Sequence, residues 1–278
     1  MSSEAGTITT SPSSSRGRAK PVVRRRRMSK GVVLVYALRA LLLAVVIVAW
    51  QLIGGQSKNT AFFVSTPVAV WHALTHLVTT GEFWTDLRYT MYETVVGFLI
   101  AGAAGILFGF ALALSYTAHR VIEPLMNALN SLPRIALASL FILWFGLGTS
   151  SKIALVISLV FFPFFLNSYK GATTIDSDIQ LLMRTLNASR FAYMRKVTLP
   201  STVPWIIAGA KLGIALALGG AIVGEIIASQ HGLGAELNVA AESFNTAQEF
   251  AVLIVLIIAA MILNGIAQGI EARASRWR

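Results

Sequence analysis

Long stretches without charged residues constrain this chain more than any other feature of its sequence. Only 13% of the 278 residues are charged and 55% are hydrophobic, whereas soluble domains average about 25% and about 45–50%. A helix needs roughly 20 mostly apolar residues to cross the hydrocarbon core of a bilayer, and several stretches reach that length. The sequence therefore predicts an all-α, polytopic membrane protein.

Six segments have the length and composition of membrane-spanning helices. Pro133 interrupts the third and Pro163 lies within the fourth, while Arg39 lies near one end of the first, where its aliphatic stem can snorkel. The expected spans cover residues 33–54, 91–115, 122–147, 152–168, 203–228 and 250–271.

Two segments between the spans are long enough to hold structure of their own. We expect residues 55–90 to form an external region that includes a surface helix from Pro67 to Leu87. Residues 169–201 form the longest loop on the opposite, cytoplasmic side.

The distribution of basic residues predicts the orientation. Cytoplasmic segments of membrane proteins are enriched in Lys and Arg. With the N-terminus inside, the external segments contain only Lys58, Arg88 and Lys152 of the 23 basic residues, and most of the others lie on the cytoplasmic side. Both termini are therefore expected in the cytoplasm.

The first 31 residues differ from the transmembrane domain that we expect over 32–278. They are rich in Ser, Thr and Arg, and they are expected to form a disordered cytoplasmic tail whose basic run at 24–27 lies near anionic lipid. The polar part is too long for a signal peptide. Although the net charge is +11, the basic residues gather at membrane boundaries, so we expect no nucleic-acid partner.

Polar residues inside membrane spans are costly and usually face a cavity or a partner. Lys211 can be explained by snorkelling to the cytoplasmic interface. Glu225 fits either a hydrogen bond between helices or a position beside a solute pathway. The candidates for lining such a pathway are Asn130, Ser131, Asn167, Lys211 and Glu225.

Small residues recur at four-residue spacing in three of the spans. Such faces let helix backbones approach closely in lipid. They are typical of ordinary bundle packing and also of a moving interface around a pathway. The sets are Ala101, Gly105 and Gly109; Gly209 and Gly213; and Gly265 and Gly269.

The sequence does not support several kinds of catalytic or ligand-binding site. The chain has no cysteine. His72 and His76 share a helix face, a spacing that can bind zinc, but no third ligand is evident. No lysine follows a glycine, so the phosphate-binding loop that ends in Gly-Lys-Ser/Thr is absent. We expect no enzyme activity, no metal and no cofactor bound by this chain.

The segment 176–206 is the most informative loop. Asp176 or Ser177 can cap a helix that carries Ile179, Leu182, Met183 and Leu186 at helical spacing, with Arg184, Arg190, Arg195 and Lys196 on its other face, and Leu199-Pro200 is expected to end that helix. Such a short amphipathic helix can lie on lipid or bind a soluble partner.

This segment resembles the cytoplasmic coupling loop of binding-protein-dependent ABC import permeases. Residues 184–189 look like the usual Arg-Thr-Leu-Gly-Ala-Ser, and the end of the loop matches the family's Ile, one residue, Leu-Pro. Leu181 stands where the family has Glu, and Asn187 where it has Gly, although Asn tolerates a left-handed backbone. The implied ATPase-coupling residues are Leu182, Met183, Arg184, Thr185, Leu186, Asn187, Ala188, Ser189, Val197, Leu199 and Pro200.

Further motifs over roughly 65–278 resemble the nitrate/sulfonate/taurine-type permeases. Among them are Ser65-Thr66-Pro67, Leu143 to Gly148, Glu225 and Gly232-Leu233-Gly234. The resemblance implies the type I importer permease fold, a homodimer in the bacterial inner membrane surrounded by lipid, an external substrate-binding protein, and ABC ATPase subunits that hold ATP and Mg. The residues do not identify the solute. The alternatives are an ion-coupled secondary transporter or channel without an ATPase, and a membrane scaffold without transport.

Overall fold

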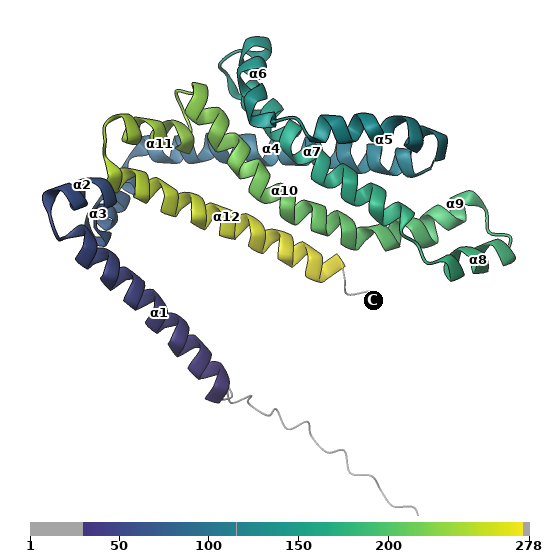
Figure 1. The fold of residues 1–278 in the computed structure, drawn as a ribbon, viewed down its shortest axis with the longest axis horizontal. Coiled ribbons are helices and arrows are strands. Elements are labelled where there is room, and N and C mark those ends of the chain that lie inside the picture. The colour runs from purple at the N-terminus through teal and green to yellow at the C-terminus, as the bar shows by residue number, and fades with distance from the viewer. Residues whose placement is uncertain (1–29, 115, 275–278) are drawn as a thin grey trace, which may run out of the picture. The chain divides into compact units, whose positions relative to one another are not determined.

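A computed structural model of the chain describes residues 30–114 and 116–274, and every regular element in these ranges is helical. The all-α prediction is confirmed (Figure 1). The elements are α1 (Lys30–Gly54), α2 (Lys58–Val64), α3 (Pro67–Thr79), α4 (Gly81–Ala113), α5 (Tyr116–Asn130), η1 (Arg134–Leu137), α6 (Ala138–Phe145), α7 (Thr149–Thr173), α8 (Ser177–Thr185), α9 (Arg190–Tyr193), η2 (Met194–Thr198), α10 (Leu199–Ala228), α11 (Leu233–Glu242) and α12 (Thr246–Ala274).

Five helical stretches are long and apolar enough to cross a membrane. They are Leu34–Gly54, Gly81–Ala113, Thr149–Thr173, Arg190–Ala228 and Thr246–Arg273, and the fourth runs without a break through α9, η2 and α10. The segment expected over 122–147, with an interruption at Pro133, is a pair of helices bent by 81° at a break that contains Pro133, where the proline ring stops the first helix from continuing. The basic tail expected over residues 1–31 lies almost entirely outside the described residues.

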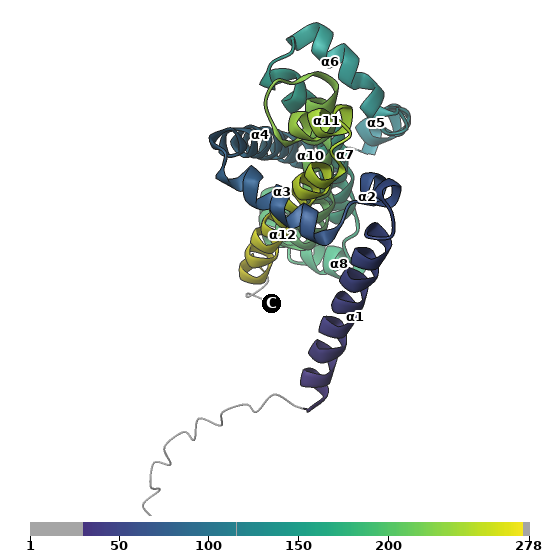
Figure 2. The ribbon, with the colours of Figure 1, turned by 90° about the vertical axis from the view of Figure 1, so that its left-hand side faces the viewer.

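The chain divides into two compact units, one ending at Val48 and the other beginning at Ala49, and the core lies in the second. There α7 packs against both α4 and α10. Figure 2 looks roughly along these three helices from the end that carries α11. Val156 and Val160 of α7 are fully buried between Ala101 of α4 and Ala217 of α10.

Small residues make the close contact between α4 and α7 possible. A methyl group placed on Gly105 would lie 2.7 Å from the Phe161 carbonyl oxygen, and one on Gly109 would lie 2.7 Å from the Phe165 carbonyl oxygen. The predicted packing face of α4 is therefore confirmed. In contrast, a methyl group placed on Gly265 would meet nothing within 4 Å among residues 30–114 and 116–274, and the same holds for Gly269.

Gly105→Ala should destabilise the protein because the new methyl group would press on backbone atoms of α7. Overpacking of this kind costs about 1–3 kcal/mol, which outweighs the gain in helix propensity of about 1 kcal/mol. The matched control is Gly219→Ala in α10, where nothing lies within 4 Å. Unfolding in detergent should show a loss of stability for the first variant and none for the second. Equal effects would contradict the close approach.

The external segment differs from the prediction in two ways. The single surface helix expected from Pro67 to Leu87 is wrong, because Thr80 adopts an extended backbone (ψ 140°) and its hydroxyl donates to the Leu77 carbonyl at 2.6 Å. Lys152, expected in an external loop, is a buried residue of the first turn of α7. The second error arises because a helix can extend beyond its apolar part, and hydropathy reports only the apolar part.

Candidate functional site

Five polar side chains gather where α4, α7 and α10 meet α11. This polar cluster consists of Asp86, Thr90, Glu93, Lys152 and Glu225. Glu93 and Lys152 are each only 2% exposed and Glu225 is 1% exposed. Charged side chains are almost never buried so completely unless they are paired. The polar cluster is therefore a built feature of the fold.

Three members of the polar cluster hold the start of α11. The first N–H groups of a helix have no partner within the helix, and its positive end attracts carboxylates. The hydrogen bonds run from Gly232 N to Asp86 Oδ1 (2.8 Å), from Leu233 N to Thr90 Oγ1 (2.8 Å) and from Gly234 N to Glu225 Oε2 (2.7 Å). Side chains of two long helices thus anchor a third helix by its N-terminus.

Glu225 is the centre of this anchor. Its Oε1 also accepts a hydrogen bond from Thr90 Oγ1 at 2.7 Å. Gly232 has a φ of +111°, and a methyl group there would lie 2.2 Å from the Glu225 carboxyl carbon, so only glycine fits. Of the two interpretations that the sequence allows for Glu225, the structure favours the hydrogen bond between helices.

Glu93 and Lys152 form the other half of the polar cluster. Lys152 Nζ donates to the carbonyl oxygens of Leu147 and of Gly148, the latter at 3.2 Å. Glu93 lies beside Thr149 and Glu225, and its Oε2 has no hydrogen-bond partner among the residues that the structure describes. Both side chains line a cavity of about 550 Å³.

Sequence reasoning missed Glu93, Lys152, Asp86 and Thr90. A signal was present for Glu93, because it is an acidic residue inside the expected span 91–115. Asp86, Thr90 and Glu93 also recur at the spacing of one helix face. Lys152 carried no such signal, because it stands before an apolar run and resembles an ordinary boundary residue.

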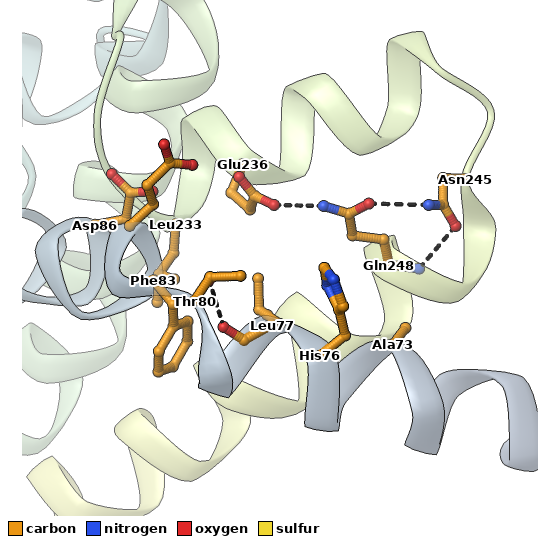
Figure 3. Close-up of a pocket in the computed structure, with 11 residues that line it drawn as sticks. Ala73, His76, Leu77, Thr80, Phe83, Asp86, Leu233, Glu236, Asn245 and Gln248 are labelled. Atoms are coloured by element: carbon orange, nitrogen blue, oxygen red, sulfur yellow. Dashed lines mark hydrogen bonds between the residues drawn. The ribbon is translucent and has the colours of Figure 1, made fainter.

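A second cavity, of about 430 Å³, lies between α3, the start of α4, α11 and α12 (Figure 3). His76 lines it opposite a row of polar side chains in which Gln248 donates to Glu236 and accepts a hydrogen bond from Asn245 at 2.9 Å. His72 does not line it. Within residues 30–114 and 116–274 no three metal-binding side chains gather.

The other pathway candidates are scattered. Asn130 and Ser131 are exposed at the end of α5, where Asn130 accepts from Arg134 and Ser131 Oγ donates to the Asn127 carbonyl at 2.9 Å. Asn167 is half-buried in α7, and its Nδ2 donates to the Pro163 carbonyl at 2.8 Å. These residues do not share a site with Glu225.

Lys211 has a specific partner. Its Nζ lies 2.7 Å from Glu271 Oε2, so the basic residue of α10 forms an ion pair with α12. Snorkelling alone is therefore not needed to explain its position. This pair lies on α10 well before Glu225, so Lys211 is not part of the polar cluster.

The loop between α7 and α10 lies at the end of α10 opposite α11 (Figure 1). The single helix expected from Asp176 or Ser177 to Leu199-Pro200 is interrupted, because α8 ends at Thr185 and α9 begins at Arg190. Asn187 has a φ of +50° between them, and the Ala188 N–H donates to the Met183 carbonyl at 3.0 Å. Asn187 thus adopts the left-handed conformation that asparagine tolerates.

Pro200 does not end the helix as the sequence suggests. Residues Met194–Thr198 form a π-helical turn in which the Leu199 N–H donates to the Met194 carbonyl, and α10 continues through Pro200 to Ala228. A π turn shifts the hydrogen-bond register by one residue, which accommodates the missing N–H of proline near the start of α10. The loop is therefore joined to a long helix without a break.

Large apolar side chains of this loop point into solvent. The exposed fractions are 65% for Leu181, 57% for Leu182, 66% for Leu186 and 65% for Phe191. Met183 is instead half-buried and lines a cavity of about 820 Å³, so the expected stripe of Leu182, Met183 and Leu186 is divided. Phe191 was not expected. Exposed apolar groups outside the membrane spans are typical of interaction sites.

Comparisons with known proteins agree with this architecture. Residues 105–277 match the family described as binding-protein-dependent transport system inner membrane component. The chain is 30% identical, over 94% of its length and 92% of the relative's, to the putative aliphatic sulfonates transport permease protein of Bacillus subtilis. It is 25% identical, over 84% and 87%, to the taurine transport system permease protein of Escherichia coli.

A solved structure has a similar fold. The inward-facing MetNI methionine ABC transporter superposes on 66% of this chain and 94% of its own with a TM-score of 0.57, at 18% sequence identity. The residues that match the family model include α7 to α12, and with them the loop and two of the five members of the polar cluster.

Proposed function

Because the chain belongs to the family of binding-protein-dependent transport system inner membrane components, we propose that it is the permease subunit of an ATP-driven importer. It acts as a multi-pass protein of the bacterial cell membrane with both termini in the cytoplasm. The single observation that carries this proposal is the α8–α9 loop, which presents Leu182, Leu186 and Phe191 to solvent at one end of the core.

Three partners are proposed for this chain: ATPase subunits, a second copy of the chain and an external binding protein. The chain has no sequence for cradling phosphate, so ATP and Mg belong to separate ATPase subunits that bind the α8–α9 loop. A second copy of the chain completes the pathway, and an external binding protein delivers the solute to the end that carries α11. The residues expected to couple are Leu182 to Ser189 with Val197, Leu199 and Pro200.

The solute belongs to the small organic sulfonates. Two observations support this class: relatives that cover most of the chain are a sulfonate and a taurine transport permease, and the polar cluster contains a buried cation, Lys152, beside a cavity. A riboflavin transport permease of Chloroflexus aurantiacus is also 29% identical over 84% of this chain and 88% of its own length, so the family itself admits other solutes.

The structure suggests how a displacement of the α8–α9 loop is transmitted to the opposite side of the membrane. α10 has 30 residues, which at about 1.5 Å per residue is roughly 45 Å. The π turn joins it to α9 at one end, and Glu225 holds α11 at the other. When the ATPase subunits close and displace α8 and α9, α10 moves as a rigid element and carries α11 with it. Rocking of this kind opens and closes a pathway.

Reconstitution tests the proposal. The chain, an ATPase subunit and a binding protein in liposomes should take up taurine only when ATP is present. Uptake by the purified chain alone, driven by an ion gradient, would favour a secondary transporter. If the full complex takes up nothing although all subunits assemble, the chain is a scaffold.

The proposed topology makes a direct prediction, since the chain has no cysteine of its own. Single cysteines at Ser57 and Ser243 should react with a membrane-impermeant thiol reagent in intact cells. A cysteine at Ser189 should react only after permeabilisation. All three positions are exposed in the chain, so in cells that lack the ATPase and the binding protein access to the reagent depends only on the side of the membrane. External labelling at Ser189 would reject the orientation.

A further inference from the structure

We propose that the cavity of about 820 Å³ between the α8–α9 loop and the ends of α4 and α7 binds the headgroup of an anionic phospholipid, whose phosphate is held by Arg184 and Arg190. The inference goes beyond the proposed function, which concerns the ATPase, the binding protein and the solute. It requires only that the chain spans a membrane, and it gives α8 a second partner.

The first argument is the position and size of the cavity. Ala113 is the last residue of the span formed by α4, Ala172 is next to the last residue of the span formed by α7, and Arg190 begins the stretch that contains α10. Figure 1 shows α8 and α9 beyond the ends of α7 and α10. The cavity therefore lies where spans begin and end, at the level of lipid headgroups. Its volume falls within the range of about 300–1,000 Å³ that is typical of small-molecule sites.

The second argument is a pair of cations without an anion. Arg184 and Arg190 both line the cavity, and among the described residues neither side chain forms an ion pair with a carboxylate or a hydrogen bond. No acidic side chain of residues 30–114 or 116–274 lines the cavity. A guanidinium presents five N–H donors in a planar fork that matches the oxygens of a phosphate. The cavity therefore offers positive charge and donors to an anion that the described chain does not supply.

The third argument is an apolar track that leads from the membrane interior to the cavity. Phe110 and Leu114 at the end of α4 line the cavity, and Leu107 lies on the same helix face one turn earlier. Leu107 and Leu114 are each 69% exposed. An acyl chain can lie along this track while its headgroup reaches the two arginines. A free phosphate would leave the apolar wall uncovered, so the lining favours a lipid.

The fourth argument is that α8 presents different faces to the cavity and to solvent. Gln180, Met183 and Arg184 are spaced by three and four residues, so they share the face that lines the cavity. Leu182 lies on another face with Leu186, and these two exposed residues are expected to bind the ATPase. A lipid in the cavity therefore does not compete for Leu182 and Leu186, and it supports the loop that presents them.

Protection of a single cysteine tests the site in the full-length permease, without the ATPase, in lipid nanodiscs. Ala188→Cys places a thiol on the cavity wall of a chain that has no other cysteine. This thiol should react with N-ethylmaleimide several-fold more slowly in phosphatidylglycerol than in phosphatidylcholine with the same acyl chains. The control is Ser189→Cys, an exposed neighbour that does not line the cavity. Each rate is divided by the rate of this control in the same lipid, which removes the general effect of membrane charge on a thiol.

Second variants in the Ala188→Cys chain identify the groups that bind. Arg184→Gln together with Arg190→Gln should abolish the protection by phosphatidylglycerol. The matched control is Arg195→Gln together with Lys196→Gln, which removes the same charge from exposed residues of the same loop outside the cavity and should keep the protection. If the first double variant fails to fold, the comparison of the two lipids in the Ala188→Cys chain still decides the question.

Each outcome has one meaning. Equal relative rates in the two lipids would overturn the site, and loss of protection in both double variants would reduce it to a general attraction between a basic loop and an anionic surface. Protection by inorganic phosphate in phosphatidylcholine would assign the cavity to a soluble anion. Protection by the ATPase but not by phosphatidylglycerol would assign it to that partner. None of these rates depends on ATP-driven uptake, so the proposed function stands or fails by a separate measurement.

Discussion

Replacing Glu225 with alanine should release the start of α11 and destabilise the protein by roughly 1–3 kcal/mol, the cost of one buried group left unpaired. The change leaves the Gly234 N–H buried without the carboxylate oxygen that it contacts at 2.7 Å, whereas the Thr90 hydroxyl loses its contact at 2.7 Å but keeps the Asp86 carbonyl at 3.2 Å. Thermal unfolding in detergent measures the total. Hydrogen exchange followed by mass spectrometry should show faster exchange over residues 232–236.

The matched control for this variant is Glu242→Ala. Glu242 is an exposed residue of the same helix α11, and it accepts one hydrogen bond from Asn238 Nδ2 at 2.9 Å. Surface substitutions of this kind usually change stability by about 0.5 kcal/mol or less. If Glu225→Ala behaves like this control in both measurements, then Glu225 does not anchor α11 and α10 cannot carry that helix during transport.

Leu186→Asp should abolish binding of the ATPase while the permease remains folded in the membrane. Leu186 is 66% exposed in the chain, so the aspartate costs the permease little by itself. In a docked complex the charge would be buried without a partner at about 1–3 kcal/mol, and each 1.4 kcal/mol is about tenfold in affinity. Co-purification and substrate-stimulated ATP hydrolysis are the measurements.

The matched control places the same charge at the other end of the molecule. Phe244 is 69% exposed between α11 and α12, so Phe244→Asp should leave co-purification of the ATPase unchanged. Full stimulation of ATP hydrolysis in Leu186→Asp would mean that the ATPase binds elsewhere.

The turn beside Leu186 gives a graded test of the same loop. Asn187 has a φ of +50°, which glycine adopts freely and a β-branched residue adopts only with strain. Asn187→Gly should therefore keep ATPase stimulation. Asn187→Val should weaken it, because the strain disturbs the turn that sets α8 relative to α9. Equal stimulation in the two variants would show that this conformation is not needed.

The sequence alone determined the class of fold, the long spans and the place of the loop. These properties depend on local composition, because a bilayer selects for about 20 apolar residues in a row and leaves the helix as the means of pairing the backbone. The packing face of α4 was also readable, since Ala101, Gly105 and Gly109 repeat within one helix. The left-handed turn at Asn187 is likewise a property of one residue and its neighbours.

Only the tertiary structure decided where the helices break and which polar groups meet. The extended residue Thr80 interrupts a predicted helix, and the π turn before Pro200 lets another helix continue. The conformational preferences of the local sequence signal neither change. The polar cluster joins Asp86, Glu93, Lys152 and Glu225 from three helices. No local pattern can pair residues so distant in sequence, because only the packing of α4, α7, α10 and α11 brings them together, and the same packing supplies the hydrogen-bond partners of the buried Glu225 and Lys152.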